Sequence, residues 1–196
     1  MIAILLNDAS FEQDIRELLM AFYPGETFTH KEEEAGEAEL IVRGVRDGNS
    51  FSLDVTPVKK EAVHFALIYP DFSNRFETKN EIKQTLYRLL SAQTGRELPW
   101  GTLTGIRPTK IALTKLYDGW TDEQIETYMR ETYFTSKEKI DLSIDVAERE
   151  RRLLSTIDYE NGYSLYVGIP FCPTTCLYCS FTSFPIGKWQ GRTGLY

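Results

Sequence analysis

The chain has 196 residues, of which 42% are hydrophobic and 26% are charged, a composition typical of a globular protein. Its formal net charge of −7 and its isoelectric point near 5.0 argue against a nucleic-acid interface, which depends on clustered lysine and arginine. No apolar run approaches the ~20 residues of a membrane-spanning helix, and Met1–Leu6 is too short for a signal peptide. We therefore expect a cytoplasmic protein without a membrane span.

The N-terminal segment predicts a strand followed by a helix. Met1–Leu6 is apolar, and Ser10 with Gln13 three residues later forms a capping-box pattern that would begin a helix. Pro24-Gly25 would end this helix. Its apolar face, at helical spacing, consists of Ile15, Leu18, Leu19 and Phe22.

Short strands are expected next. Leu40–Val45 and Phe51–Val55 are rich in β-branched and aromatic residues, and the Asp47-Gly48 pair between them is a strong hairpin-turn signal. We therefore expect an antiparallel pair. Val63–Tyr69 is either a third strand or the start of a helix, because periodicity alone cannot decide the type of so short a run.

Three polar features in this half of the chain suggest no site. The acidic run Lys31–Glu39 is interpreted as a solvated loop or strand lead-in rather than a metal site. His64 is flanked by Val63 and Phe65, so we expect a packed or edge-strand residue rather than a ligand. His30 is likewise not assigned to a site.

From Asn80 to about Ser155 the apolar period of 3.6 residues predicts helices. The first ends at Gly95, and the second begins with Pro108 at its first helical position and ends at Tyr117. The apolar stripe of the first of these helices, the one that ends at Gly95, consists of Ile82, Leu86, Leu89 and Leu90.

Two capping-box patterns predict the remaining helices. Thr121 pairs with Gln124, and Thr135 pairs with Glu138. The second pattern would begin a long helix with apolar positions at Ile140, Leu142, Ile144, Val146, Leu153 and Leu154.

The segment Leu98–Lys110, L-P-W-G-T-L-T-G-I-R-P-T-K, connects two of these helices. Gly101 and Gly105 allow close backbone approach, and a helix N-terminus favours an anion beside Arg107, Thr109 and Lys110. The spacing is not that of a P-loop, and two glycines before a helix usually make a tight connection. We favour docking of Arg107 against a catalytic domain over ligand binding.

The three cysteines of the chain, Cys172, Cys176 and Cys179, follow the spacing C-x-x-x-C-x-x-C. A structural zinc site normally has four protein ligands, and no fourth cysteine is present. A four-iron cluster held by three thiolates leaves one iron open to a substrate or cofactor. The loop therefore predicts a catalytic 4Fe-4S cluster, and three clustered cysteines fit a reducing compartment.

The sequence Y-V-G-I-P-F-C-P-T-T-C-L-Y-C-S-F-T-S, which contains these cysteines, resembles the radical S-adenosylmethionine (radical SAM) superfamily. Within it the run is most similar to oxygen-independent coproporphyrinogen III oxidases of the HemZ type, as is Leu98–Lys110. The resemblance implies a porphyrin (heme) biosynthesis enzyme with a 4Fe-4S cluster and S-adenosylmethionine. Its radical would remove hydrogen from a propionate of coproporphyrinogen III, which loses carbon dioxide to become vinyl.

The resemblance also implies site residues and partners. Cys172, Cys176 and Cys179 would bind the metal cluster, and the aromatic residues Tyr166, Phe171 and Tyr178 would lie beside the cofactor. Catalytic residues remain unassigned. The partners would be a porphyrinogen or heme and an electron-donor protein, while the oligomeric state stays open.

Two positions differ from the better-known anaerobic oxidases. Those enzymes usually have a histidine where this chain has Gly168, and a fourth cysteine where it has Phe181. Both differences fit the HemZ-type branch. They keep open an alternative, a radical SAM-like heme-binding chaperone that has the cluster motif without the decarboxylation. A zinc-bound interaction module is a third hypothesis.

The expected fold class is α/β, with an accessory N-terminal domain in residues 1–159 and the start of a radical SAM domain in residues 160–196. The polar turn Asp158–Gly162 marks the boundary. Ser164–Val167 would be the first strand of a truncated (β/α) barrel, since a complete barrel needs about 200 residues or more. We expect such a chain to be inactive alone, with Pro170–Pro185 exposed and an apolar patch at Phe171, Leu177, Phe181 and Phe184.

Overall fold

The computed structural model describes residues 1–58, 63–105, 107–158, 161–174, 176, 177, 179, 181, 184 and 185. The chain separates into a first unit, Met1–Ser155, and a second unit, Thr156–Tyr196. The predicted domain boundary between residues 159 and 160 falls on two residues outside the described ranges.

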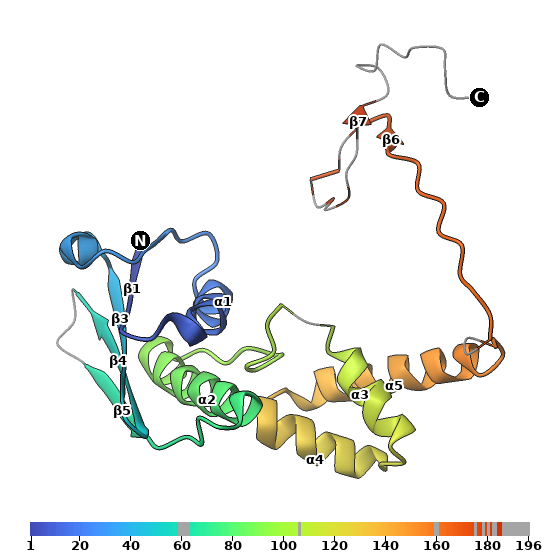
Figure 1. Ribbon diagram of the computed structural model, residues 1–196, viewed down its shortest axis with the longest axis horizontal. Helices are drawn as coiled ribbons and strands as arrows, with labels where there is room; N and C mark the ends of the chain where they lie inside the picture. Colours follow the sequence, from blue (N-terminus) through green and yellow to red (C-terminus); the bar gives the residue numbers. More distant parts are fainter. Residues whose placement is uncertain are drawn as a thin grey trace. The chain divides into compact units, whose positions relative to one another are not determined.

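The first unit opens with a five-stranded mixed sheet in the order β2-β1-β3-β4-β5 (Figure 1). Strand β1 is parallel to both β2 and β3, and β3, β4 and β5 are successively antiparallel. The bounds are β1 Ile2–Leu6, β2 Phe28–Thr29, β3 Leu40–Asp47, β4 Ser50–Pro57 and β5 His64–Ile68. The predicted N-terminal strand and hairpin are confirmed, and of the two alternatives for Val63–Tyr69 the strand is correct.

Two helices cover one face of this sheet (Figure 1). Helix α1 spans Glu12–Phe22 and helix α2 spans Arg75–Thr94. Alternate residues of β4 are buried, as expected for a strand with one face against a core. The core between sheet and helices includes Ile4, Ile15, Leu18, Leu19, Phe22, Val42, Phe51, Leu53, Val55, Ile82, Leu86 and Leu90.

Helix α2 begins earlier than the apolar period indicates. Asn74 is its N-cap and accepts a hydrogen bond from the Glu77 backbone at 3.3 Å, so the first turn precedes Asn80. Gly95 ends the helix in the left-handed conformation, as predicted.

The acidic run forms a 3-10 helix rather than a loop, and it leads into β3, the second of the two predicted alternatives. This helix, η2, spans Glu32–Glu37 and contributes Ala35 to a small cluster with Ala3 of β1 and Ala38. The Arg43 guanidinium pairs with Glu32, and Lys31 pairs with Glu34 at 2.6 Å. The run is thus ordered by an apolar contact on one side and ion pairs on the other.

The predicted Ser10–Gln13 capping box does not form. Asp8 stands before a 3-10 helix, η1 Ala9–Phe11, and its Oδ1 accepts a hydrogen bond from the Ser10 backbone at 2.9 Å. Gln13 instead donates to Glu17 at 3.0 Å. The cap is therefore Asp8, because the first helical turn begins at Ala9 and its free N–H groups lie next to the Asp8 carboxylate.

This cap predicts a pH-dependent contribution to stability. Hydrogen bonds from the side chain and backbone of Ser10, and then from Arg46, lower the pKa of Asp8 from 3.8 to about 2. Because the folded pKa lies below the unfolded one, the stabilisation is complete above pH 3.8 and is lost as the pH falls to 2. Asp8→Asn should therefore lower the free energy of unfolding by about 1 kcal/mol at pH 7, a value reduced for solvent screening. Urea denaturation from pH 7 to pH 2 measures it, and a pH-independent difference would contradict the assignment.

The C-terminal part of the first unit is helical. Helices α3 (Thr109–Tyr117), α4 (Asp122–Tyr133) and α5 (Lys137–Leu154) share a second core. Pro108 is the N-cap of α3 rather than its first helical residue. The core consists of Ala112, Leu113, Leu116, Ile125, Met129, Ile140, Ile144 and Ala147.

Only part of the apolar pattern of α5 faces this core. Ile140, Ile144 and Ala147 are buried, while Leu142, Val146 and Leu153 are exposed. The buried residues follow the 4- and 3-residue steps of one helix face, and the exposed ones lie off it. The helix therefore has a narrower buried face than the sequence predicts.

The two remaining capping patterns have different outcomes. Thr121 and Gln124 form the predicted reciprocal box at the start of α4, with backbone-to-side-chain distances of 3.3 and 2.9 Å. The box predicted for Thr135 does not form, since α5 begins at Lys137 with Ser136 as N-cap. Thr135 is 2% exposed, and among the described residues its hydroxyl has no hydrogen-bond partner.

Valine substitutions should show that Thr121 caps a helix and that Thr135 does not. Thr121→Val removes a cap that satisfies a helical N–H group and should lower the free energy of unfolding by about 1 kcal/mol. Thr135→Val removes a buried hydroxyl without a partner, so it should leave stability unchanged or raise it by up to about 1 kcal/mol. Urea denaturation of both variants is the measurement, and equal losses would show that Thr135 is a cap after all.

The second unit has little regular structure in its described residues. Strands β6 (Phe171–Cys172) and β7 (Phe184–Pro185) form a short parallel pair. Ser164–Val167, predicted as the first barrel strand, is not a strand here. A barrel strand is hydrogen-bonded to neighbours along its edges, and none pairs with this segment among the described residues. No helix in the described ranges has the length and apolar character needed to cross a membrane.

Candidate functional site

The loop that carries the three cysteines is closed at its base. Phe171 pairs with Phe184, and Cys172 with Pro185, in the short β6–β7 ladder. The Phe184 backbone N–H donates to the Pro170 carbonyl at 2.7 Å, and the centroids of the Phe171 and Phe184 rings are 6.5 Å apart. The two ends of the loop are therefore held together by backbone pairing and an aromatic contact.

All three cysteines are free thiols. Cys176 is exposed, and Cys172 and Cys179 are half-buried. The Cys179 backbone N–H donates to the Cys176 carbonyl at 3.0 Å, which makes a turn between these two positions. The sulfur of Cys179 lies 3.8 Å from the Phe181 carbonyl oxygen.

The three cysteine thiols are suitable ligands for an iron–sulfur cluster, although their sulfur atoms are not arranged around a common centre. Among the described residues no three His, Cys, Asp or Glu side chains lie in an arrangement that holds a metal ion. Reduced thiols on one short loop are the ligands that such clusters use, and none of the three is bound in a disulfide. A cluster would therefore have to draw the thiolates together.

The predicted cofactor-side aromatics have different surroundings. Tyr166 is 82% exposed, and Phe171 is half-buried against Phe184. Tyr178 lies outside the described residues. A Cβ atom at Gly168 would come within 3.1 Å of the Tyr166 ring, so a side chain at this position requires the ring to move.

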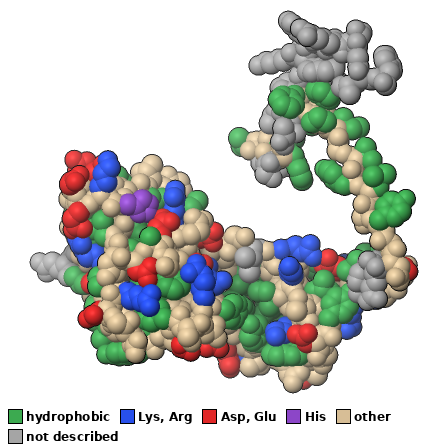
Figure 2. All heavy atoms as spheres, in the orientation of Figure 1, with side chains coloured by type: hydrophobic (Ala, Val, Ile, Leu, Met, Phe, Trp, Pro, Cys, Tyr) green, Lys and Arg blue, Asp and Glu red, His purple; other side chains and the backbone are tan. Residues whose placement is uncertain are grey.

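Apolar side chains around the cysteines are exposed, as the sequence predicts. Leu177, Phe181 and Phe184 are all exposed, and only Phe171 of the expected patch is half-buried. The preceding segment, Tyr163–Ile169, also carries exposed hydrophobic side chains along its length (Figure 2). Such a concentration of exposed apolar surface is typical of an interface.

Within the first unit, the segment Leu98–Lys110 packs closely against the end of α4 at Gly101. Gly101 has φ +57°, and a Cβ there would lie 1.9 Å from the Tyr133 carbonyl oxygen. The Thr102 backbone N–H donates to that oxygen at 2.7 Å. The close approach that the sequence predicts is thus made to the end of α4.

Arg107 makes an ion pair within the first unit, and its docking against a catalytic domain stays a prediction. Its guanidinium forms an ion pair with Glu150 of α5 at 2.6 Å, within the first unit. The pair occupies the Arg107 guanidinium and so also disfavours the alternative of anion binding at the start of α3. An ion pair with a neighbouring helix could not be inferred, because Glu150 lies 43 residues away.

Neither histidine lies in a group of potential metal ligands in the described part of the chain. His30 Nδ1 is 3.3 Å from the Ile4 carbonyl oxygen, and its Nε2 is 3.4 Å from a Glu12 carboxylate oxygen. His64 lies in β5, the edge strand of the sheet. The prediction that His64 is an edge-strand residue is confirmed.

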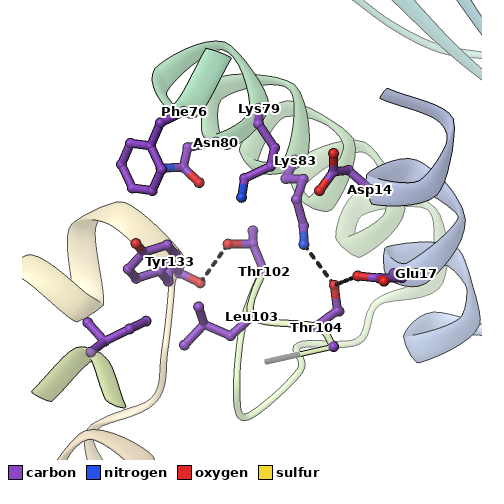
Figure 3. Close-up of a pocket in the computed structure, with 12 residues that line it drawn as sticks. Asp14, Glu17, Phe76, Lys79, Asn80, Lys83, Thr102, Leu103, Thr104 and Tyr133 are labelled. Atoms are coloured by element: carbon purple, nitrogen blue, oxygen red, sulfur yellow. Dashed lines mark hydrogen bonds between the residues drawn. The ribbon is translucent and has the colours of Figure 1, made fainter. Parts of the chain in front are cut away.

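A pocket of about 390 Å³ in the first unit was not predicted (Figure 3). We call it the α1–α2 pocket, because it is lined by Asp14, Glu17, Phe76, Lys79, Asn80, Lys83, Thr102, Leu103, Thr104, Gly105, Ile111 and Tyr133. Its most unusual residue is Lys83, which is buried. A signal for it exists in the sequence, since Lys83 shares the helix face of Leu86, Tyr87 and Leu90.

Comparison with known proteins provides one relative. No family model and no solved structure matches the chain. The chain is 35% identical over 145 residues to a protein of Bacillus subtilis (strain 168) named oxygen-independent coproporphyrinogen-III oxidase-like protein HemZ. The match covers 72% of this chain and 28% of that protein, so the chain spans well under a third of its relative's length. The expected resemblance to HemZ-type, coproporphyrinogen-III oxidase-like proteins is therefore confirmed.

Proposed function

We propose that the chain is part of a radical SAM enzyme that acts on coproporphyrinogen III, with Cys172, Cys176 and Cys179 as the ligands of a 4Fe-4S cluster. The observation that carries this proposal is the three-thiol loop in a chain related to a protein named as coproporphyrinogen-III oxidase-like. The proposed reaction is oxidative decarboxylation of propionate side chains to vinyl groups. When bound, the cluster and S-adenosylmethionine would supply the one-electron chemistry.

The loop itself contributes three free ligands and a closed base. Cys172 belongs to β6, so its backbone is held by pairing with β7, while Cys176 is exposed and open to incoming iron and sulfide. The turn between Cys176 and Cys179 keeps these two thiols on one short segment. Phe171, packed against Phe184, would shield one side of the cluster from water.

The aromatic residues Tyr166, Phe171 and Tyr178 are proposed to contact S-adenosylmethionine. Tyr178 stands between the second and third ligands in the sequence, and the resemblance implies that its ring approaches S-adenosylmethionine. Tyr178→Ala should weaken S-adenosylmethionine binding to the reconstituted protein, measured by equilibrium dialysis. Unchanged affinity would assign this ring to packing.

The first unit is proposed to be an accessory domain. Its two cores are built from its own helices and strands. The described residues contain no histidine or cysteine group arranged for metal binding, and the sequence shows no nucleophile-and-base pair. Its contribution to the proposed reaction would be docking or closure over the substrate.

Anaerobic reconstitution with iron and sulfide tests the assignment. We expect about four iron and four sulfide ions per chain, and an electron paramagnetic resonance signal of the reduced cluster that changes when S-adenosylmethionine is added. Bound zinc without sulfide would contradict the cluster.

The heme-binding alternative is tested on the same preparation. Titrations with heme and with coproporphyrinogen III are compared by binding and not by turnover, because the chain alone is expected to be inactive. Stoichiometric heme binding without any binding of coproporphyrinogen III would favour a chaperone over the proposed enzyme.

A further inference from the structure

The α1–α2 pocket contains a buried lysine at its centre. Lys83 is 6% exposed, and its ammonium group donates to the Thr104 hydroxyl at 2.7 Å. That hydroxyl in turn donates to a Glu17 carboxylate oxygen at 3.1 Å (Figure 3). An ammonium has three N–H donors, and Thr104 accepts one of them.

A second lysine faces the same space. Lys79 lies one helical turn before Lys83, and both side chains reach from α2 toward Thr102–Thr104 (Figure 3). Within the described ranges neither forms an ion pair at 4.0 Å or less. Burial lowers the pKa of Lys83, the Lys79 charge adds to this, and the Asp14 and Glu17 charges oppose it. Two like charges one turn apart on a helix repel each other, and the carboxylates of Asp14 and Glu17 offset this repulsion at Lys83.

The remaining walls of the pocket are of two kinds. Phe76, Leu103, Ile111 and the ring of Tyr133 supply apolar surface, while Asn80 and Thr102 supply polar groups. The Lys79 ammonium lies 5.6 Å from the centre of the Phe76 ring, so the charged and apolar parts adjoin. The volume of about 390 Å³ is within the range of small-molecule sites, which starts at about 300 Å³.

We propose that the α1–α2 pocket binds a small organic monocarboxylate. Its carboxylate lies between the ammonium groups of Lys79 and Lys83, and its apolar body packs against Phe76, Leu103 and Tyr133. The carboxylates of Asp14 and Glu17, which line the same pocket from α1, repel a second negative charge. The pocket therefore discriminates against a dianion such as phosphate. This site is independent of the cysteine loop and of the function proposed for it.

The test uses the full chain labelled with ¹⁵N and titrated with 3-phenylpropionate or inorganic phosphate. We expect saturable shifts of the amide signals of residues 79–83 and 102–105 with 3-phenylpropionate, and binding at least tenfold weaker with phosphate. Lys79→Met and Lys83→Met each remove a charged hydrogen-bond donor and should weaken carboxylate binding about tenfold or more. Lys137→Met, which changes an exposed lysine of α5, is the matched control and should bind as the unmodified chain does.

Several outcomes would overturn the proposal. They are the absence of saturable shifts with 3-phenylpropionate, phosphate binding as tight as that of the carboxylate, and unchanged affinity in both pocket variants. Lys83 also connects α2 to Glu17 through Thr104, so thermal unfolding of each variant is measured first. If Lys83→Met does not fold, the carboxylate affinity of Lys79→Met decides the test. Lys79 is half-buried, and its ammonium forms no hydrogen bond to the described residues, so its loss should not prevent folding.

Discussion

Replacing Cys176 with alanine should reduce the iron and sulfide bound after anaerobic reconstitution from about four of each per chain to near zero. The chain has three cysteines in all, and a four-iron cluster on this loop needs each of them. In the described part of the chain no group of His, Asp or Glu side chains stands ready to replace a lost thiolate. Cys172→Ala and Cys179→Ala should have the same effect. The readouts are metal and sulfide analysis and the brown absorbance at ~400 nm.

Thr174→Ala is the matched control for these substitutions. Thr174 is an exposed residue of the same loop, between the first two cysteines, and its side chain is not a cluster ligand. This variant should bind iron and sulfide as the unmodified chain does. A full cluster in Cys176→Ala would refute the ligand assignment, and loss of the cluster in Thr174→Ala would show that the loop is disrupted by any change.

Gly101→Ala should strongly destabilise the first unit. Gly101 has φ +57°, and the new Cβ would lie 1.9 Å from the Tyr133 carbonyl oxygen and 2.6 Å from the Phe134 carbonyl carbon. Both are backbone atoms, so the clash cannot be relieved by rotating a side chain. The Thr102–Tyr133 backbone hydrogen bond, 2.7 Å long, would be lost as the segments separate. We expect the free energy of unfolding to fall by about 3–5 kcal/mol, a large part of the total for a domain.

Gly95→Ala separates steric conflict from backbone strain. Gly95 also has a positive φ, +68°, but a Cβ there would meet nothing within 4 Å. Only the cost of the left-handed conformation remains, about 1 kcal/mol. Urea denaturation of both variants is the measurement. If the two substitutions cost the same, the contact between Gly101 and the end of α4 contributes nothing to stability.

The local features of this fold were determined by the sequence. Strand β1 and the β3–β4 hairpin follow from short apolar runs and the Asp47-Gly48 turn, and Gly95 ends α2 because glycine accepts a left-handed conformation. The Thr121–Gln124 box forms from residues three apart. The resemblance to HemZ-type proteins was likewise evident, because the motifs that carry it, the run around the cysteines and Leu98–Lys110, are continuous stretches of the chain.

Features that depend on distant residues were decided only by the tertiary structure. Thr121 and Thr135 begin equivalent sequence patterns, yet Thr135 is buried and Ser136 precedes the helix instead. Arg107 pairs with Glu150, 43 residues away. Ser164–Val167 has strand-like residues but no paired neighbour among the described residues, and a strand is completed by hydrogen bonds that another segment supplies.

The α1–α2 pocket belongs to this second group. Asp14 and Glu17 come from α1, Lys79 and Lys83 from α2, and Thr102–Thr104 from the segment that follows. A sequence pattern shows that Lys83 lies on an apolar helix face, but it does not show what covers that face. Only the packing of these three segments takes the ammonium group out of water, and this loss of solvent lowers the pKa of Lys83.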